Sequence, residues 1–153
     1  MSLRKLFIVI SIVFFTCNIK QEIISTSDQA IITSIHSLEH YVDSIYNKTI
    51  MDALYIGKYY DEPPMTDGKY RTLSPSLQRE LENSFNAIII ENKTEIKGPY
   101  NFLTLEPTEG DDTNSEIRIG WSNAEKHFEM YQINLTYDSA EWKLTNIQLT
   151  GYR

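Results

Sequence analysis

The last quarter of the chain alternates between apolar and polar residues. Two runs, 117–121 and 131–137, place an apolar side chain at every second position. This period of two is typical of a β-strand with one buried and one wet face. The apolar positions are Ile117, Ile119 and Trp121 in the first run and Tyr131, Ile133, Leu135 and Tyr137 in the second. The region therefore predicts an antiparallel sheet with one covered face.

A polar break at 138–141 predicts a hairpin between the second run and the end of the chain. In the final segment Trp142 and Leu144 share one parity, whereas Ile147 and Leu149 share the other. A β-bulge near residues 145–146 would return both pairs to the same face. We therefore expect an irregular last strand with Trp142 in the core.

Helical periodicity precedes this sheet. Five apolar residues follow one another at spacings of four and three, which is the stripe of an amphipathic helix. They are Ile31, Ile35, Leu38, Val42 and Ile45. Thr26 and Gln29 have the spacing of a capping box and predict the start of this helix.

Two further helices are expected before the strands. A short one is predicted over 49–55, ended by Gly57, and residues 58–71 read as a loop. Ser74 and Pro75 then supply a cap and a first helical residue. The stripe of that helix is Leu77, Leu81, Phe85 and Ile88. A short strand at 101–105 and a polar turn at 106–115 complete an α+β plan, in which helices cover one face of an antiparallel sheet.

The first seventeen residues have the order of an export signal. A basic start is followed by an apolar run at 6–15, interrupted only by Ser11, which is too short to span a bilayer. Cys17, the sole cysteine, comes directly after it. This resembles a bacterial lipoprotein signal, although Phe15 and Thr16 stand where small residues are usual. The alternative is an incidental cysteine in an uncleaved anchor.

If Cys17 is lipidated, the chain divides into a signal peptide at 1–16, a tether at 17–26 and a single α+β domain at 27–153. The membrane would then be a partner through the N-terminal lipid. Asn18 replaces the aspartate that retains lipoproteins at the inner membrane in enteric bacteria, which favours the outer membrane.

The charge balance limits the classes of partner. The formal net charge is −7 and the isoelectric point is about 4.9. Nucleic-acid binding needs basic patches, so we expect no nucleic-acid partner. An acidic surface fits either simple solvation or a basic protein partner.

Four motifs together resemble small bacterial exported lipoproteins of unknown function with a nuclear-transport-factor-2-like (ketosteroid-isomerase-like) domain. They are Tyr41 with Tyr46, Leu73-Ser74-Pro75-x-Leu77, Gly98-Pro99-Tyr100-x-Phe102-Leu103 and Trp142-Lys143-Leu144-x-x-Ile147. The resemblance spans 36–149 and implies a cystatin-like cone of curved sheet wrapped by helices, with an apolar pocket in its mouth. Enzymes of this fold pair a pocket Asp or His with a Tyr. No pair here matches residue by residue, so no catalytic residue is carried over.

Aromatic residues supply the candidate pocket. Its lining would be Tyr41, Tyr46, Trp121, Tyr131, Tyr137 and Trp142. The alternative is that these rings pack the core and its rim, since tyrosine buries its ring and keeps its hydroxyl wet. Ser139, in Asp138-Ser139-Ala140 at the predicted hairpin tip, resembles an O-glycosylation acceptor of Bacteroidetes exported proteins.

Two motifs suggest metals but fail on geometry. His36 and His40 match an inverted zinc-protease signature, yet they lie about half a turn from the apolar stripe and should face water. Asp111 and Asp112 lack the spacing of a calcium loop and predict a solvated turn. We therefore expect no metal and no cofactor.

The sequence thus favours a lipid-anchored, non-enzymatic binding module of the bacterial envelope. One alternative is an immunity lipoprotein that neutralises a secreted antibacterial toxin, to which an acidic inhibitor would be steered by charge. Another is an isomerase or dehydratase that uses the cone pocket.

Overall fold

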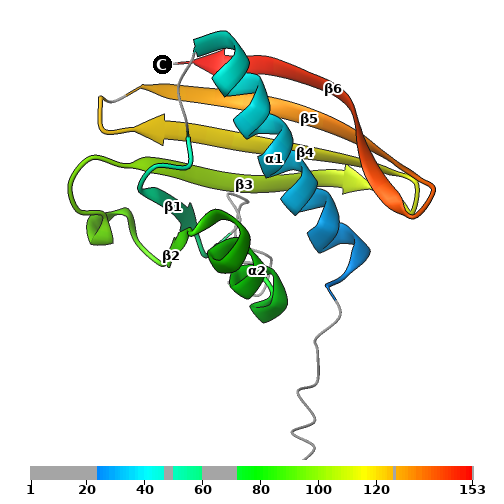
Figure 1. Cartoon of the computed structure of the whole chain (residues 1–153), viewed down its shortest axis with the longest axis horizontal. Helices are drawn as coiled ribbons and strands as arrows, with labels where there is room; N and C mark the ends of the chain where they lie inside the picture. Colours follow the sequence, from blue (N-terminus) through cyan, green and yellow to red (C-terminus); the bar gives the residue numbers. More distant parts are fainter. Residues whose placement is uncertain (1–23, 47–49, 60–71, 126, 153) are drawn as a thin grey trace, which may run out of the picture.

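The computed structural model describes residues 24–46, 50–59, 72–125 and 127–152. Two helices pack on one face of a six-stranded, mostly antiparallel sheet (Figure 1), which confirms the α+β plan. The elements are α1 (Thr26–Tyr46), β1 (Leu54–Gly57), α2 (Pro75–Phe85), β2 (Ile88–Ile90), the 3₁₀ helix η1 (Lys93–Glu95), β3 (Asn101–Gly110), β4 (Asn114–Asn123), β5 (Phe128–Asp138) and β6 (Glu141–Tyr152). Within the described ranges, no helix is both long and apolar enough to cross a membrane.

The strands lie in the order β2-β1-β3-β4-β5-β6. Strands β3 to β6 form the predicted antiparallel meander, in which Leu103 lies opposite Trp121, and Trp121 lies opposite Glu129. Strand β1 is parallel to both of its neighbours, β2 and β3. In Figure 1, α1 runs diagonally over β4, β5 and β6, while α2 lies beside the short parallel strands.

The capping residue of α1 is Ser25, one residue before the predicted cap at Thr26. The Ser25 hydroxyl accepts a hydrogen bond from the backbone N–H of Asp28, so Ser25 takes the role predicted for Thr26. Four of the five stripe residues are buried, but Ile45 is 52 % exposed. The stripe is therefore correct for the body of the helix and wrong for its last turn.

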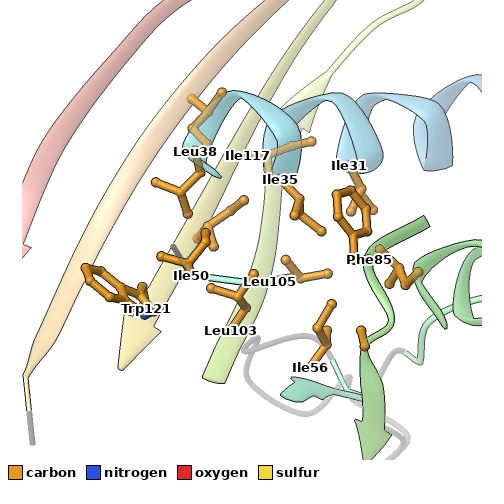
Figure 2. Close-up of a cluster of buried hydrophobic side chains, with 14 of the residues drawn as sticks. Ile31, Ile35, Leu38, Ile50, Ile56, Phe85, Leu103, Leu105, Ile117 and Trp121 are labelled. Carbon is orange, nitrogen blue, oxygen red and sulfur yellow. The ribbon is translucent and has the colours of Figure 1, made fainter. Parts of the chain in front are cut away.

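The main core lies between α1, α2 and the sheet. Figure 2 shows Ile31, Ile35 and Leu38 of α1 directed toward side chains of β3 and β4, with Phe85 of α2 closing one side. Ile35 and Leu38 are fully buried. Burying one such side chain stabilises the fold by about 1.5–3 kcal/mol, so this stripe holds α1 on the sheet.

The helix predicted over 49–55 is wrong. Residues 47–49 lie outside the described part, Asp52 and Ala53 form a turn, and Leu54, Tyr55 and Ile56 belong to β1. Leu54 and Ile56 enter the main core, whereas Tyr55 enters a second cluster with Ile90 and Phe102 on the other face. Because both faces of β1 are buried, its sequence lacks alternation and resembles one turn of an apolar helix.

The helix that begins at Pro75 ends earlier than predicted. The Ser74 hydroxyl accepts from the backbone N–H of Leu77, which confirms the cap. Asn86 adopts a left-handed conformation at φ 51° and ends α2, so Ile88 belongs to β2 and is 51 % exposed. Three consecutive β-branched residues favour the strand.

The last hairpin has the predicted form. Asp138 pairs with Glu141 across the two-residue loop, and Thr145 is an extra residue between the pairs Leu135–Leu144 and Asn134–Asn146. The bulge is therefore confirmed. A second register shift leaves Thr150 between the pairs Tyr131–Leu149 and Met130–Gly151.

The polar turn predicted over 106–115 is shorter than expected. Backbone pairing continues β3 to Gly110, and β4 begins at Asn114, so the turn comprises residues 111–113. Glu106 and Glu116 lie on these strands with the parity of the face that is open to water.

Candidate functional site

Two features of the sheet hold polar groups that a function could use. The first lies where β4 ends and β5 begins, on the face that α1 covers. Strand alternation places Glu129 and Tyr131 on this face, and the register sets Trp121 opposite Glu129. His127 precedes the strand. We call Trp121, His127, Glu129 and Tyr131 the carboxylate cluster.

The Glu129 carboxylate is the centre of this cluster. Glu129 is 3 % exposed and Tyr131 is fully buried. The Tyr131 hydroxyl donates a hydrogen bond to Oε2 of Glu129, and Nε2 of His127 lies 2.8 Å from Oε1. A buried carboxylate needs such partners, because an unpaired charge in the core is strongly unfavourable.

Aromatic side chains pack around the Glu129 carboxylate and its partners. The Trp121 ring meets the His127 ring edge-on at 5.6 Å, and its Nε1 donates to Oδ1 of Asn101 at 2.9 Å. Tyr41 of α1 contacts the Tyr131 ring edge-on at 5.9 Å. A carboxylate beside a tyrosine hydroxyl and an exposed imidazole has the groups for proton transfer, and the same groups also satisfy one another as a structural unit.

The candidate pocket residues fall into two groups. Tyr41, Trp121 and Tyr131 meet at the carboxylate cluster. Tyr137 and Trp142 lie at the opposite end of β5, with ring centroids 5.1 Å apart. The Tyr46 side chain lies outside the described part.

Most of these aromatic rings are buried in the core or packed against it. Trp121, Tyr131 and Trp142 are buried, and Tyr41 and Tyr137 are partly buried against the core. Nε1 of Trp142 donates to the carbonyl of Thr26 at 2.8 Å, which ties the last hairpin to the start of α1. Burial of Trp142 on the helix-covered face is confirmed.

The second feature is a hollow of about 520 Å³ on the opposite face, which we call the polar hollow. Glu116, Asn134 and Thr136 lie on the strand parity opposite to the core residues Ile117, Ile133 and Leu135. The hollow is lined by Asp111, Asn114, Ser115, Glu116, Asn134, Leu135, Thr136 and Thr145. Amides, hydroxyls and carboxylates therefore face the solvent there.

Hydrogen bonds arrange the rim of this hollow. Oδ1 of Asp111 accepts from the backbone N–H groups of Thr113 and Asn114 and from the Thr113 hydroxyl, at 2.6–2.8 Å. These hydrogen bonds hold the pKa of the Asp111 carboxyl below its usual value, so this group is ionised near neutral pH. Glu116 accepts from Nε2 of Gln132 at 2.9 Å and lies 3.6 Å from Arg118.

The predicted glycosylation site and metal motifs lie on the surface. Ser139 is exposed at the hairpin tip, next to Asp138, whose pKa is lowered by the Lys143 ammonium and the Ser139 hydroxyl. His36 and His40 are exposed on α1, as the helical wheel predicts. The described residues contain no group of three or more potential metal ligands. Cys17 and the signal peptide lie outside the described part.

Sequence reasoning missed the most connected polar group of the site. His127, Glu129 and Tyr131 are spaced by two, which places them on one face of a strand, and this spacing was the available signal. The polar hollow was also missed. Glu116, Asn134 and Thr136 occupy the solvent-facing parity of their strands, and only the pairing of β4 with β5 brings them together.

Comparisons with protein-family models, curated proteins and solved structures find no match to this chain.

Proposed function

We propose that this protein is a non-enzymatic binding module, anchored in the bacterial outer membrane through a lipid on Cys17, that holds a basic protein partner on the uncovered face of its sheet. The observation that carries the proposal is the polar hollow. It is open to solvent, and its lining offers hydrogen-bond donors, acceptors and two carboxylates beside the side chain of Leu135. Such a surface suits a polar protein segment better than an apolar small molecule.

Charge favours a basic partner. The chain has a net charge of −7, and two carboxylates, Asp111 and Glu116, line the hollow. Complementary charge speeds encounter and fixes orientation. A secreted antibacterial toxin with a basic surface is one such partner, which would make the protein an immunity lipoprotein.

The finer description of the fold belongs to the same proposal. We infer a cystatin-like cone of the nuclear-transport-factor-2-like kind, preceded by a signal peptide at 1–16 that is cleaved before Cys17. The four quoted motifs and the helix-covered sheet support this inference. The mature chain would enter the domain at the start of α1.

Site-specific photo-crosslinking in cells tests the binding face. A photo-reactive residue at Thr136, in the hollow, should give one discrete adduct, and the same residue at Asn83, exposed on α2, should give none. The Thr136 adduct should weaken when Glu116→Gln removes a carboxylate from the lining and should persist in Glu125→Gln, an exposed control outside it. Equal adducts at both positions, or no adduct at Thr136, would overturn the proposal.

One observation favours a second function. The buried Glu129 carboxylate, with Tyr131 and His127 as partners, has the composition of a proton-transfer site. In an isomerase or dehydratase, Glu129 would remove a proton from carbon while a hydroxyl donor stabilises the oxyanion that forms.

Glu129→Gln separates the two functions, because it keeps the size of the side chain and removes the base. An enzyme would lose complementation of a deletion strain while circular dichroism stays native. A binding module would retain both complementation and the Thr136 adduct. Lost complementation in the folded variant, with the adduct unchanged, would replace the binding proposal by the enzymatic one.

A further inference from the structure

We propose that two copies of this chain associate through their β6 strands, antiparallel and centred on Gln148, to form a continuous sheet. Strand β6 is an outer strand of the described sheet, since it pairs with β5 alone. Its twelve residues make it the longest strand described. Proteins usually protect such edges with charged residues, proline or β-bulges. Residues 144–152 have only the bulges, at Thr145 and Thr150, and contain no charged residue and no proline.

Exposed apolar side chains gather along this edge. Leu144, Leu149 and Tyr152 are 45, 41 and 80 % exposed, so β6 carries three of the six large apolar residues exposed in the described part. Their partners on β5 are Leu135, Tyr131 and Glu129, which point into the core. These three residues therefore lie on the helix-covered face, at its open border.

The two register shifts make β6 self-complementary. Residues 144, 147, 149 and 152 pair with core-facing residues of β5, whereas 146, 148 and 151 pair with residues on the uncovered face. Thr145 also lies on the uncovered face, since its hydroxyl is 3.0 Å from that of Thr136. Thr145 and Thr150 are the two extra residues, placed three before and two after Gln148.

A two-fold axis at Gln148 places each residue of one copy opposite a residue of the other copy. The two residue numbers of every such pair add up to 296. Leu144 then faces Tyr152, and Ile147 faces Leu149, so apolar residues meet on the helix-covered face. On the uncovered face Gln148 faces its own copy, and Asn146 lies opposite Thr150, the second extra residue. In this pairing Thr145 of one copy lies opposite residue 151 of the other copy, next to that copy's Thr150. The irregular backbone at the two bulges therefore coincides in the two strands. A foreign strand without this spacing would lose the match.

The same symmetry suits an anchored protein, and this step rests on the proposed lipid at Cys17. Matching faces place both α1 helices on one side of the joined sheet. Trp142 holds the start of α1, so the two helix starts lie at opposite ends of the paired strands, on the same side. Six residues separate Cys17 from Ile24 and can extend to at most about 25 Å. Both lipids could thus enter one membrane, with both polar hollows facing away from it.

Disulfide trapping of the full-length protein in native membranes tests the axis. Residues directly opposite in antiparallel strands have Cα atoms about 4.5–5.5 Å apart, within disulfide range. Gln148→Cys should give a covalent dimer on mild oxidation. Asn146→Cys is the matched control, because it is exposed on the same strand and face. Its self-distance would be about 13 Å, four residues of strand. No dimer with Gln148→Cys, or equal trapping with both, would overturn the proposal.

The mass of the protein in detergent provides a second test. Wild-type protein should be a dimer by light scattering, and Leu144→Lys with Leu149→Lys should reduce it to one copy with an unchanged circular dichroism spectrum. Ile88→Lys changes an equally exposed residue at the other edge of the sheet and should leave the dimer intact. A monomeric wild type, or a dimer broken by Ile88→Lys, contradicts the inference. Repeating the measurement with Cys17→Ala keeps this outcome independent of the anchor.

Discussion

The hydroxyl of Ser34 is buried in α1 with no hydrogen-bond partner among the described residues. A buried hydroxyl without a partner lowers stability, because its bonds to water are lost on folding. We expect Ser34→Ala to stabilise the fold by about 1 kcal/mol in a urea titration. Ser37→Ala is the control, since the Ser37 hydroxyl donates to the carbonyl of Thr33 at 2.8 Å and its loss brings no such gain. A destabilised Ser34→Ala would show that the hydroxyl has a partner.

The loop of the last hairpin places Ala140 at φ 69°, in the left-handed region that favours glycine. Ala140→Gly should therefore stabilise the protein by about 0.5–1 kcal/mol, after the larger unfolded-state entropy of glycine is subtracted. Gly98→Ala is the opposite case, because Gly98 has φ 76°, while a Cβ added there would meet no atom within 4 Å, so only the backbone conformation opposes the change. It should destabilise by about 1 kcal/mol. Thermal melts of both variants check the signs, and shifts in the same direction would contradict the argument.

At the scale of elements, Trp142 joins the last hairpin to the first helix. Its ring is buried beside Tyr137, and its Nε1 donates to the carbonyl of Thr26. We expect Trp142→Ala to destabilise the protein by about 3–5 kcal/mol, as for other core aromatics. Trp142→Phe keeps most of the packing and should lose about 1 kcal/mol with the hydrogen bond. A loss under about 1 kcal/mol for Trp142→Ala would show that the hairpin does not depend on α1.

The turn between β3 and β4 depends on the charge of Asp111. Hydrogen bonds from Thr113 and Asn114 lower the folded-state pKa of its carboxyl below the ordinary value of 3.8. A depressed pKa contributes stability that is present above the unfolded-state value and is lost as pH falls through the folded-state value. Wild type should therefore exceed Asp111→Ala in stability at pH 7, and this difference should shrink below pH 3.8. Urea titrations across this range measure it, and a constant difference would exclude the linkage.

Elements were predictable where one face of the chain differed from the other. The meander, the bulge near Thr145 and the start of α2 at Pro75 follow from local periodicity and capping. Local periodicity did not predict β1 or β2. Strand β2 has only three residues, all isoleucine, and therefore shows no alternation. Strand β1 lacks alternation for another reason. Tyr55 and Leu54 are both buried, on opposite faces, so no alternation remains.

At the scale of the whole molecule, the proposed anchor decides where the protein works. If Cys17 carries the lipid, cells fed a fatty-acid analogue should label the protein, and Cys17→Ala should abolish the label. The variant should also leave the membrane fraction, because one signal-sized apolar run is too short to span a bilayer. Ser11→Ala leaves the cysteine in place and should keep the label. Unchanged labelling of Cys17→Ala would exclude lipidation at this residue.

The sequence by itself determined the α+β class, the helix-covered meander, the hairpin at 138–141 and the burial of Trp142. Each depends on neighbours within a few residues, whose period records which face is wet. Only the tertiary structure decided that Glu129 is buried beside Tyr131 and His127, that polar residues of neighbouring strands line one open hollow, and that β6 ends the described sheet with its apolar residues exposed. The physical reason is that these features arise from strand register and from the order of strands in the sheet. Both are set by contacts between residues far apart in the chain.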